Sequence, residues 1–521
     1  MNLRETLAHR HLVLTGFTGF LGKVFAVMLL EEVPSIRRIT LVVRPKGKRV
    51  SARSRVERAF DTSPAARPLR ALHGQGLGPF LEDRIEVISG DVEAPRFGLD
   101  RPTLDALRAS QVDAVVHCAG LTDFMPDPGR ALRANVLGAK HAADIASFLR
   151  APLLHISTCF VAGNVSGKIE ESLEAGVAPN GEPFDVVEEI GALGSLCLAP
   201  EASGDRELRM DRAMDRAQAL GWPNIYCYTK ALAEHLLATR SDVPITIVRP
   251  AIVECARTYP FPGWNEGLNT AGPLAWLIST AFRHLPTRGD HIFDVVPVDD
   301  VARGMLLTLA AMLRGERPKV VQLASGDINP LRFDRAVELT GLGFRRWVRQ
   351  TGGTPADRLF RWLDPVPAST EKPGPLPVPR LRRWVSKARG WALDVQREQG
   401  ASSWVEELAG QVVVRMDEAG DALERIETML DLYRPFIEEN RYLFQTDQVR
   451  AWSDGLCAAD RDLAWGVPEI DWCHYWVDIE YPGLATWCMP VMRGEEPPLD
   501  PPSTPPLSLA GADHSQTLAG K

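Results

Sequence analysis

The stretch HLVLTGFTGFLGK, residues 11–23, decides the fold of this chain. An apolar strand pattern runs directly into three glycines spaced Gly16-x-x-Gly19-x-x-Gly22, and an apolar helical pattern follows. Glycines at this spacing let the backbone approach a pyrophosphate, whose charge then lies at the N-terminus of the helix. The chain has 42 glycines, so the strand before and the helix after make the motif informative. It predicts a dinucleotide site; a tight turn without a ligand is the alternative.

Short apolar strands alternate with helical patterns, such as Phe20–Val33 and Gly129–Leu149, as far as residue 325. Continuous apolar strands separated by helices are typical of a parallel sheet covered on both faces. We therefore predict an α/β fold with a doubly wound (Rossmann) sheet. The predicted strands are His11–Thr15, Arg38–Val43, Ile85–Gly90, Ala114–Cys118, Leu153–Ser157, Ile245–Arg249 and Val320–Ala324.

The end of the second strand indicates which dinucleotide is bound. The sequence there reads Val43-Arg44-Pro45-Lys46, where an NAD site would favour an acidic residue. Arg44 suits the ribose 2′-phosphate of NADP, because a guanidinium pairs with a phosphate in a fork. A solvated basic loop is the alternative. We predict NADPH as the cofactor.

Residues after the other strands complete the predicted crevice. Asp91 ends the third strand and can hold the adenine amino group, and the small residues after the fourth strand let backbone lie along the cofactor. Asn135, on the following helix, can be structural as easily as catalytic. The predicted cofactor-binding residues are Thr15, Gly16, Thr18, Gly19, Phe20, Leu21, Gly22, Arg44, Asp91, Val92, Ala119, Gly120, Asn135, Tyr226, Lys230, Pro250 and Ile252.

The only Tyr-x-x-x-Lys of the chain, Tyr226 and Lys230, lies between the fifth and sixth strands. The spacing brings a phenol and an ammonium onto one helix face, where the ammonium is expected to lower the pKa of the phenol for acid catalysis. Lys230 can also hold the nicotinamide ribose. Ser157 and Thr158, at the end of strand five, each offer a hydroxyl for the substrate oxygen. These four residues are the predicted catalytic set, and two unrelated surface residues are the alternative for the Tyr–Lys pair.

Hydropathy, cysteine spacing and net charge limit the classes of function that the chain can have. No stretch of 18 apolar residues predicts a membrane helix, and the N-terminus lacks a signal-peptide core. The eight cysteines are scattered without Cys-x-x-Cys, which favours a reduced cytoplasm and no metal. The net charge of −8 argues against nucleic-acid binding.

The chain divides into three predicted parts. Residues 1–335 form the NADP-binding domain, with substrate-binding insertions within 165–225 and 254–300. Residues 336–493 form a smaller, mainly helical domain that includes a helical stretch at Ser402–Leu432. Residues 494–521 carry three Pro-Pro pairs and few large apolar groups, which predicts a disordered tail.

A basic stretch with interleaved tryptophans, Phe344–Gly390, opens the second domain. Its eleven Lys and Arg face three acidic residues. Such a stretch can bind an anionic partner or an anionic membrane surface. A solvated amphipathic cover over the sheet is an equally weighted alternative.

With these residues assembled, the chain resembles an extended short-chain dehydrogenase/reductase and, more narrowly, a fatty acyl-CoA reductase with a male-sterility-type NAD(P)-binding domain. The resemblance covers roughly residues 8 to 330. Cys159-Phe160 departs from the Ala-Tyr expected there, and the C-terminal region resembles the family only loosely. The motifs that carry the resemblance are Thr15–Lys23, Ile156–Val161, Tyr228–Glu234, Val248–Glu254, Pro260–Trp264 (PFPGW) and Val296–Val301.

The resemblance implies an NADPH-dependent reductase of long-chain acyl thioesters. The substrate would be acyl-CoA or an acyl carrier protein thioester, and the product an aldehyde and then a primary alcohol. Counting back from Gly163 favours Thr158 as the family's catalytic Ser/Thr. Three alternatives stay open: a carrier-linked thioester reductase, a nucleotide-sugar epimerase or dehydratase, and a non-catalytic protein on the same scaffold.

Overall fold

In the computed structural model, the described residues are 1–47, 49–198, 206–268, 271–279, 284–285, 288–367, 386–387, 390, 430–496, 498–501, 507 and 509. At the centre of this part of the chain lies a parallel sheet of seven strands in the order β11-β7-β5-β4-β1-β2-β3. Strand order reverses on the two sides of β1, as in doubly wound dinucleotide-binding folds. The predicted fold class is confirmed. The strands are β1 (His11–Thr15), β2 (Arg38–Val43), β3 (Ile85–Ser89), β4 (Ala114–His117), β5 (Leu153–Ile156), β7 (Ile245–Pro250) and β11 (Val320–Leu323).

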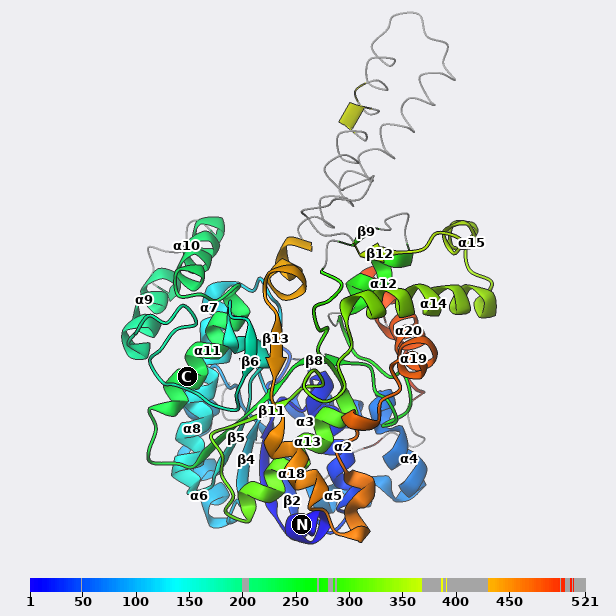
Figure 1. Cartoon of the computed structure of the whole chain (residues 1–521). Helices are drawn as coiled ribbons and strands as arrows, with labels where there is room; N and C mark the ends of the chain where they lie inside the picture. Colours follow the sequence, from blue (N-terminus) through cyan, green and yellow to red (C-terminus); the bar gives the residue numbers. More distant parts are fainter. Residues whose placement is uncertain are drawn as a thin grey trace, which may run out of the picture.

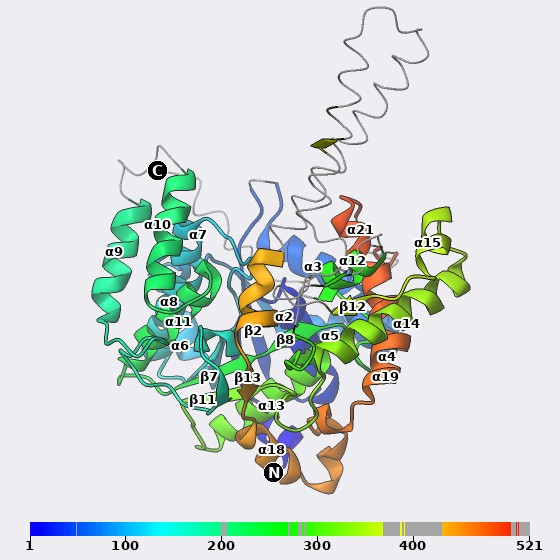
Figure 2. The same cartoon turned by 45° about the horizontal axis from the view of Figure 1, so that its top comes forward.

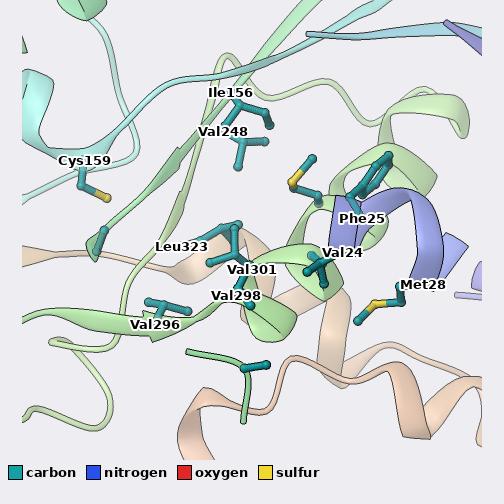
Figure 3. Close-up of a cluster of buried hydrophobic side chains, with 14 of the residues drawn as sticks. Val24, Phe25, Met28, Ile156, Cys159, Val248, Val296, Val298, Val301 and Leu323 are labelled. Carbon is teal, nitrogen blue, oxygen red and sulfur yellow. The ribbon is translucent and has the colours of Figure 1, made fainter. Parts of the chain in front are cut away.

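Helices cover both faces of this sheet, because successive strand residues point to opposite sides. Val13 and Val115 pack into a cluster with α6, α8 and α11, whereas Leu14 and Val116 face the larger cluster that includes α2 and α13. Figure 3 shows this larger cluster, with α2 and α13 side chains near those of β5, β7 and β11. The helices around the sheet are α1 (Leu3–Leu7), α2 (Phe20–Glu32), α3 (Ala52–Thr62), α4 (Arg67–His73), α5 (Leu77–Arg84), α6 (Arg101–Ala109), α8 (Gly138–Leu149), α11 (Ile225–Ala238) and α13 (Val298–Leu313).

The helix predicted at Gly129–Leu149 is interrupted. It begins as the single turn α7 (Pro128–Ala131), continues as a π-helical turn, η4 (Leu132–Leu137), and only then becomes α8. Turns of this kind are rare and occur frequently at functional sites, since the extra residue re-aims a side chain. The residue presented here is Asn135.

Two groups of helices flank the carboxyl edge of the sheet. Helices α9 (Val186–Leu198) and α10 (Arg206–Ala219) lie on one flank, whereas α14 (Phe333–Thr351) and α15 (Pro355–Phe360) lie on the other, in both Figure 1 and Figure 2. Between them lies β13, which pairs in parallel with β6. The short strands outside the main sheet are β6 (Gly167–Ile169), β8 (Ile252–Glu254), β9 (His284–Leu285), β10 (Val295–Pro297), β12 (Val366–Pro367) and β13 (Tyr442–Phe444).

The described C-terminal residues pack directly on the sheet domain. Phe444, Trp476 and Tyr481 belong to the same buried cluster as the strands, and the Trp476 indole donates to Thr340 Oγ1 at 2.8 Å. The helical stretch predicted at 402–432 lies almost entirely outside the described residues. The remaining described helical elements are η1 (Pro64–Ala66), η2 (Gly74–Gly76), η3 (Pro95–Gly98), η5 (Cys159–Ala162), α12 (Ala271–Ser279), η7 (Pro435–Glu439), α18 (Asp447–Asp454), η8 (Ala458–Leu463), η9 (Val467–Glu469), α19 (Trp472–His474), η10 (Tyr475–Glu480), α20 (Tyr481–Gly483), η11 (Leu484–Cys488) and α21 (Met489–Met492).

The division into domains and the disordered tail stay predictions. The proposed boundary at residue 335 falls in the first turn of α14. Most of the tail lies outside the described residues. Within it, Asp500 forms ion pairs with Arg67 and Arg70 of α4, so this point of the tail is attached to the sheet domain.

Candidate active site

The predicted site residues gather at one edge of the sheet. Those after a strand follow β1, β2, β3, β4, β5 or β7, and the carboxyl ends of parallel strands meet at the same edge. Tyr226 and Lys230 lie on α11, which contacts the turn after β5. The sequence prediction that these residues share one crevice therefore agrees with the topology.

The glycine loop after β1 has the shape that a pyrophosphate needs. Gly16 has φ +82°, and a Cβ there would lie 2.5 Å from the Cys118 carbonyl carbon. A Cβ on Gly22 would lie 2.2 Å from the Gly16 oxygen. Both positions therefore require glycine. The loop opens α2, whose first N–H groups have no partner within the helix and face the loop. The loop fits a dinucleotide.

One predicted cofactor residue uses its side chain elsewhere. The Thr15 hydroxyl is fully buried and lies 2.8 Å from His117 Nδ1. Thr15 therefore contributes its backbone position to the loop, and its side chain anchors β1 to β4.

Two guanidinium groups lie near the end of β2, one on the residue that follows the strand and one on α3. Arg44 lies 3.2 Å from Glu93 Oε1 and 3.5 Å from Asp91 Oδ2, and is half exposed. Arg55, on α3, donates to Thr18 Oγ1 at 3.2 Å and to the Arg44 carbonyl. Burial and then the charge of Arg44 lower the pKa of Arg55. No ion pair to Arg55 is found among the described residues, so this corner is suited to an added anion.

Tyr226 and Thr158 meet at the catalytic end of the crevice. Burial raises the pKa of the Tyr226 phenol, and a hydrogen bond with Thr158 acts in the opposite direction. The Ser157 hydroxyl is instead buried without a partner among the described residues. The geometry therefore favours Thr158 over Ser157. The predicted lowering of the Tyr226 pKa by Lys230 is not what the structure shows, because burial has the largest effect on this phenol and raises its pKa. A raised pKa favours the protonated form that a proton donor needs.

Lys230 lies beneath the loop that follows β4. Its Nζ donates to the Ile156 carbonyl at 2.8 Å, and a Cβ on Gly120 would come within 3.2 Å of it. Burial lowers the pKa of Lys230 to about 8. A side chain at position 120 would therefore crowd this ammonium.

Asn135 connects the two halves of the site. Its Oδ1 accepts from the Leu121 backbone N–H at 2.8 Å, and its Nδ2 donates to Thr229 Oγ1 at 3.1 Å. Asn135 therefore holds the loop after β4 against α11, one residue from Lys230. This contact makes it a positioning residue.

The PFPGW motif covers the first helix of the dinucleotide site. The Trp264 ring lies 5.1 Å from the Phe20 ring. Lys23, just after the glycine loop, forms an ion pair with Glu266, with Nζ 2.6 Å from Oε2. This loop therefore packs against the first turn of α2.

Sequence reasoning missed several residues near the site. Arg55 has no local signal, because only the fold brings α3 to the glycine loop. His117 and His155 are fully buried on adjacent strands with ring centroids 5.3 Å apart, and burial lowers the pKa of both. Each of these histidines is a polar residue within an apolar strand, and this pattern could have identified them from the sequence. Phe124, in the loop after β4, lies 5.8 Å from the Tyr226 ring.

The described residues hold neither a metal site nor a membrane-spanning helix. No group of three or more His, Cys, Asp or Glu side chains there is placed to hold a metal ion. None of the helices in the described part combines the length and the apolar character that crossing a membrane requires.

This crevice and its helix-borne Tyr–Lys pair define an extended short-chain dehydrogenase/reductase. Residues 14–305 match the family model described as Male sterility protein, an NAD-binding domain. The chain belongs to this family, which confirms the predicted class and a nicotinamide cofactor.

Curated relatives are similar over most of the chain. "Fatty acyl-CoA reductase 2, chloroplastic" of Arabidopsis thaliana is 25% identical over 505 residues, covering 92% of this chain and 78% of the relative. "Alcohol-forming fatty acyl-CoA reductase" of Simmondsia chinensis is 26% identical over 362 residues, covering 67% and 73%.

Solved structures support the fold alone. The reductase (R) domain of a non-ribosomal peptide synthetase from Mycobacterium tuberculosis has a TM-score of 0.51 at 17% identity, covering 94% of this chain and 95% of that one. The terminal R domain of the myxalamid PKS-NRPS pathway has a TM-score of 0.50 at 18% identity, covering 90% and 91%.

Proposed function

We propose that this protein reduces long-chain fatty acyl thioesters, with NADPH, to the aldehyde and on to the primary alcohol. The observation that carries the proposal is the buried Tyr226 phenol beside Thr158, with Lys230 one helical turn away against the loop that follows β4. Membership of the family and the names of the relatives agree with this chemistry.

The chain's residues orient the substrate and supply protons. When bound, NADPH supplies the hydride that the carbonyl carbon accepts. Tyr226 and Thr158 would hydrogen-bond the carbonyl oxygen and stabilise the negative charge that develops on it. Tyr226 would then protonate this oxygen, while the Lys230 ammonium favours the resulting phenolate. Collapse of the hemithioacetal releases the thiol, and the aldehyde can occupy the same position for a second reduction.

The first prediction concerns stoichiometry. With hexadecanoyl-CoA, the purified protein is expected to oxidise two NADPH for each free thiol released, since each reduction consumes one hydride. Absorbance at the NADPH band, a thiol reagent and chromatography of the lipid product measure this together. One NADPH per thiol would make the aldehyde the end product, and no thioester-dependent oxidation would contradict the proposal.

We further propose that Arg44 and Arg55 bind the 2′-phosphate of NADPH. Arg55→Gln is expected to raise the KM for NADPH by about 10- to 100-fold, as loss of one charged hydrogen bond does, and to leave the KM for NADH nearly unchanged. Initial rates with each cofactor measure the ratio. Arg53→Gln, on the same helix, is the matched control because Arg53 donates to the Leu509 carbonyl instead. An unchanged cofactor ratio in Arg55→Gln would contradict this assignment.

The carrier of the acyl thioester, contact with a membrane and the cellular location of the enzyme stay predictions. Acyl-CoA and acyl carrier protein thioesters are distinguished by comparing their kcat/KM values, and an epimerase would instead retain its cofactor through purification. Membrane contact through residues 344–390 is supported by three exposed apolar side chains beside Arg358 and Arg361, namely Leu359, Trp362 and Leu363. Residues 368–385, 388 and 389 of that stretch lie outside the described residues. A cytoplasmic location also stays a prediction.

A further inference from the structure

A narrow aromatic cavity lies next to the proposed catalytic residues. Its free volume is about 20 Å³, so the rings that line it must move apart to admit a ligand. One carboxylate, Asp294, is among the residues that line it, and its oxygens accept hydrogen bonds from Ser325 and Gly326. The cavity therefore presents mainly hydrocarbon. The lining residues used below are Phe124, Phe160, Ile252, Phe436, Tyr442 and Phe444.

This cavity adjoins the catalytic end of the crevice. Phe124 lines it and also lies 5.8 Å, ring to ring, from Tyr226. Ile252, on the other side, is one of the predicted cofactor contacts and follows β7. A carbonyl that bonds the Tyr226 hydroxyl therefore has the cavity directly beside it.

The far wall comes from the C-terminal part of the chain. Phe160 makes edge-on contacts with Phe436, Tyr442 and Phe444, at centroid distances of 5.1, 5.6 and 5.6 Å. Two contacts hold the wall in place. Strand β13 pairs with β6, and the Tyr442 hydroxyl donates a hydrogen bond to the Gly163 carbonyl at 3.0 Å. Figure 1 shows β13 between β6 and β8. Phe160, which replaces an expected tyrosine, keeps this wall free of another hydroxyl.

We propose that this cavity binds the acyl chain of the thioester and that residues 433–444 set the preferred chain length. The inference rests on the proposed function, since the thioester carbonyl must lie at Tyr226. The carbons behind that carbonyl leave the crevice along Phe124, and each methylene removed from water favours binding by about fourfold. Aromatic and aliphatic side chains make up most of the lining, and such a surface favours a saturated chain over a polar group.

The test compares two thioesters in one variant. Phe436→Trp narrows the cavity, so kcat/KM for hexadecanoyl-CoA is expected to fall about tenfold or more relative to that for butanoyl-CoA. Butanoyl-CoA, too short to reach the wall, should keep its rate within about twofold. Phe80→Trp, a half-buried phenylalanine on α5, is the matched control and should leave the ratio unchanged. The ratio is insensitive to a partial loss of folded protein.

Two further outcomes are decisive. Phe436→Ala removes contacts with the chain and is expected to lower the same ratio severalfold. If kcat/KM changes by the same factor for both thioesters in both Phe436 variants, the proposal is overturned.

If the wild-type protein reduces neither thioester, the proposed function fails, and binding of a fluorescent polyene fatty acid then tests separately whether the cavity binds an acyl chain. Weaker probe binding in Phe436→Trp than in Phe80→Trp would support an acyl site, and equal binding would overturn it.

Discussion

Replacing Tyr226 with phenylalanine is expected to lower kcat for thioester reduction by about 10²- to 10⁴-fold, the range that a positioned acid contributes. The phenol is buried beside Thr158, and phenylalanine keeps the ring while removing the proton that the reduction needs. The dissociation constant for NADPH, measured by fluorescence, should change little. A loss confined to kcat identifies a group that acts on the reacting carbonyl.

Tyr228 provides the matched control on the same helix. Its hydroxyl donates to Glu189 of α9, which also pairs with Arg216. Tyr228→Phe removes the same atom from a buried site that faces away from the crevice. It should keep kcat within a few-fold of the wild type, although the free energy of unfolding decreases. Similar losses of kcat in both variants would mean that Tyr226 acts through packing and not through its proton.

The pH dependence of reduction should report Lys230. Burial lowers the pKa of this ammonium to about 8, so it loses its proton as the pH rises through that value. Because the charged form favours the Tyr226 phenolate, kcat/KM should fall about tenfold per pH unit above pH 8. The pKa of Tyr226 is raised, so the phenol does not produce this limb. Initial rates between pH 6 and 10 give the profile.

Lys230→Met should lower kcat/KM at pH 7 by about 10- to 100-fold and abolish the descending limb near pH 8. Lys140→Met is the matched control, because Lys140 pairs with Asp144 on the exposed face of α8. Its profile should match that of the wild type. A limb that survives in Lys230→Met would assign the titration to another group.

Local pattern was enough to locate the strands and the Tyr–Lys pair. The seven predicted strands match the observed ones to within one residue at each end, because apolar runs bounded by turns are a property of neighbouring residues. The glycine loop and the i,i+4 spacing of Tyr226 and Lys230 are equally local. Fold class and family followed from these features, and both are confirmed.

The partners of each site residue depended on the order of strands in the folded sheet. Arg55 meets Thr18, Asn135 meets Thr229, and Phe160 meets Phe436 across long separations in the chain, which no short window of sequence contains. Burial is likewise a property of the fold: it raises the pKa of Tyr226 where the sequence predicted that Lys230 would lower it. Local motifs therefore predict the class of reaction. The pKa of Tyr226 and the lining of the proposed acyl cavity depend on long-range packing.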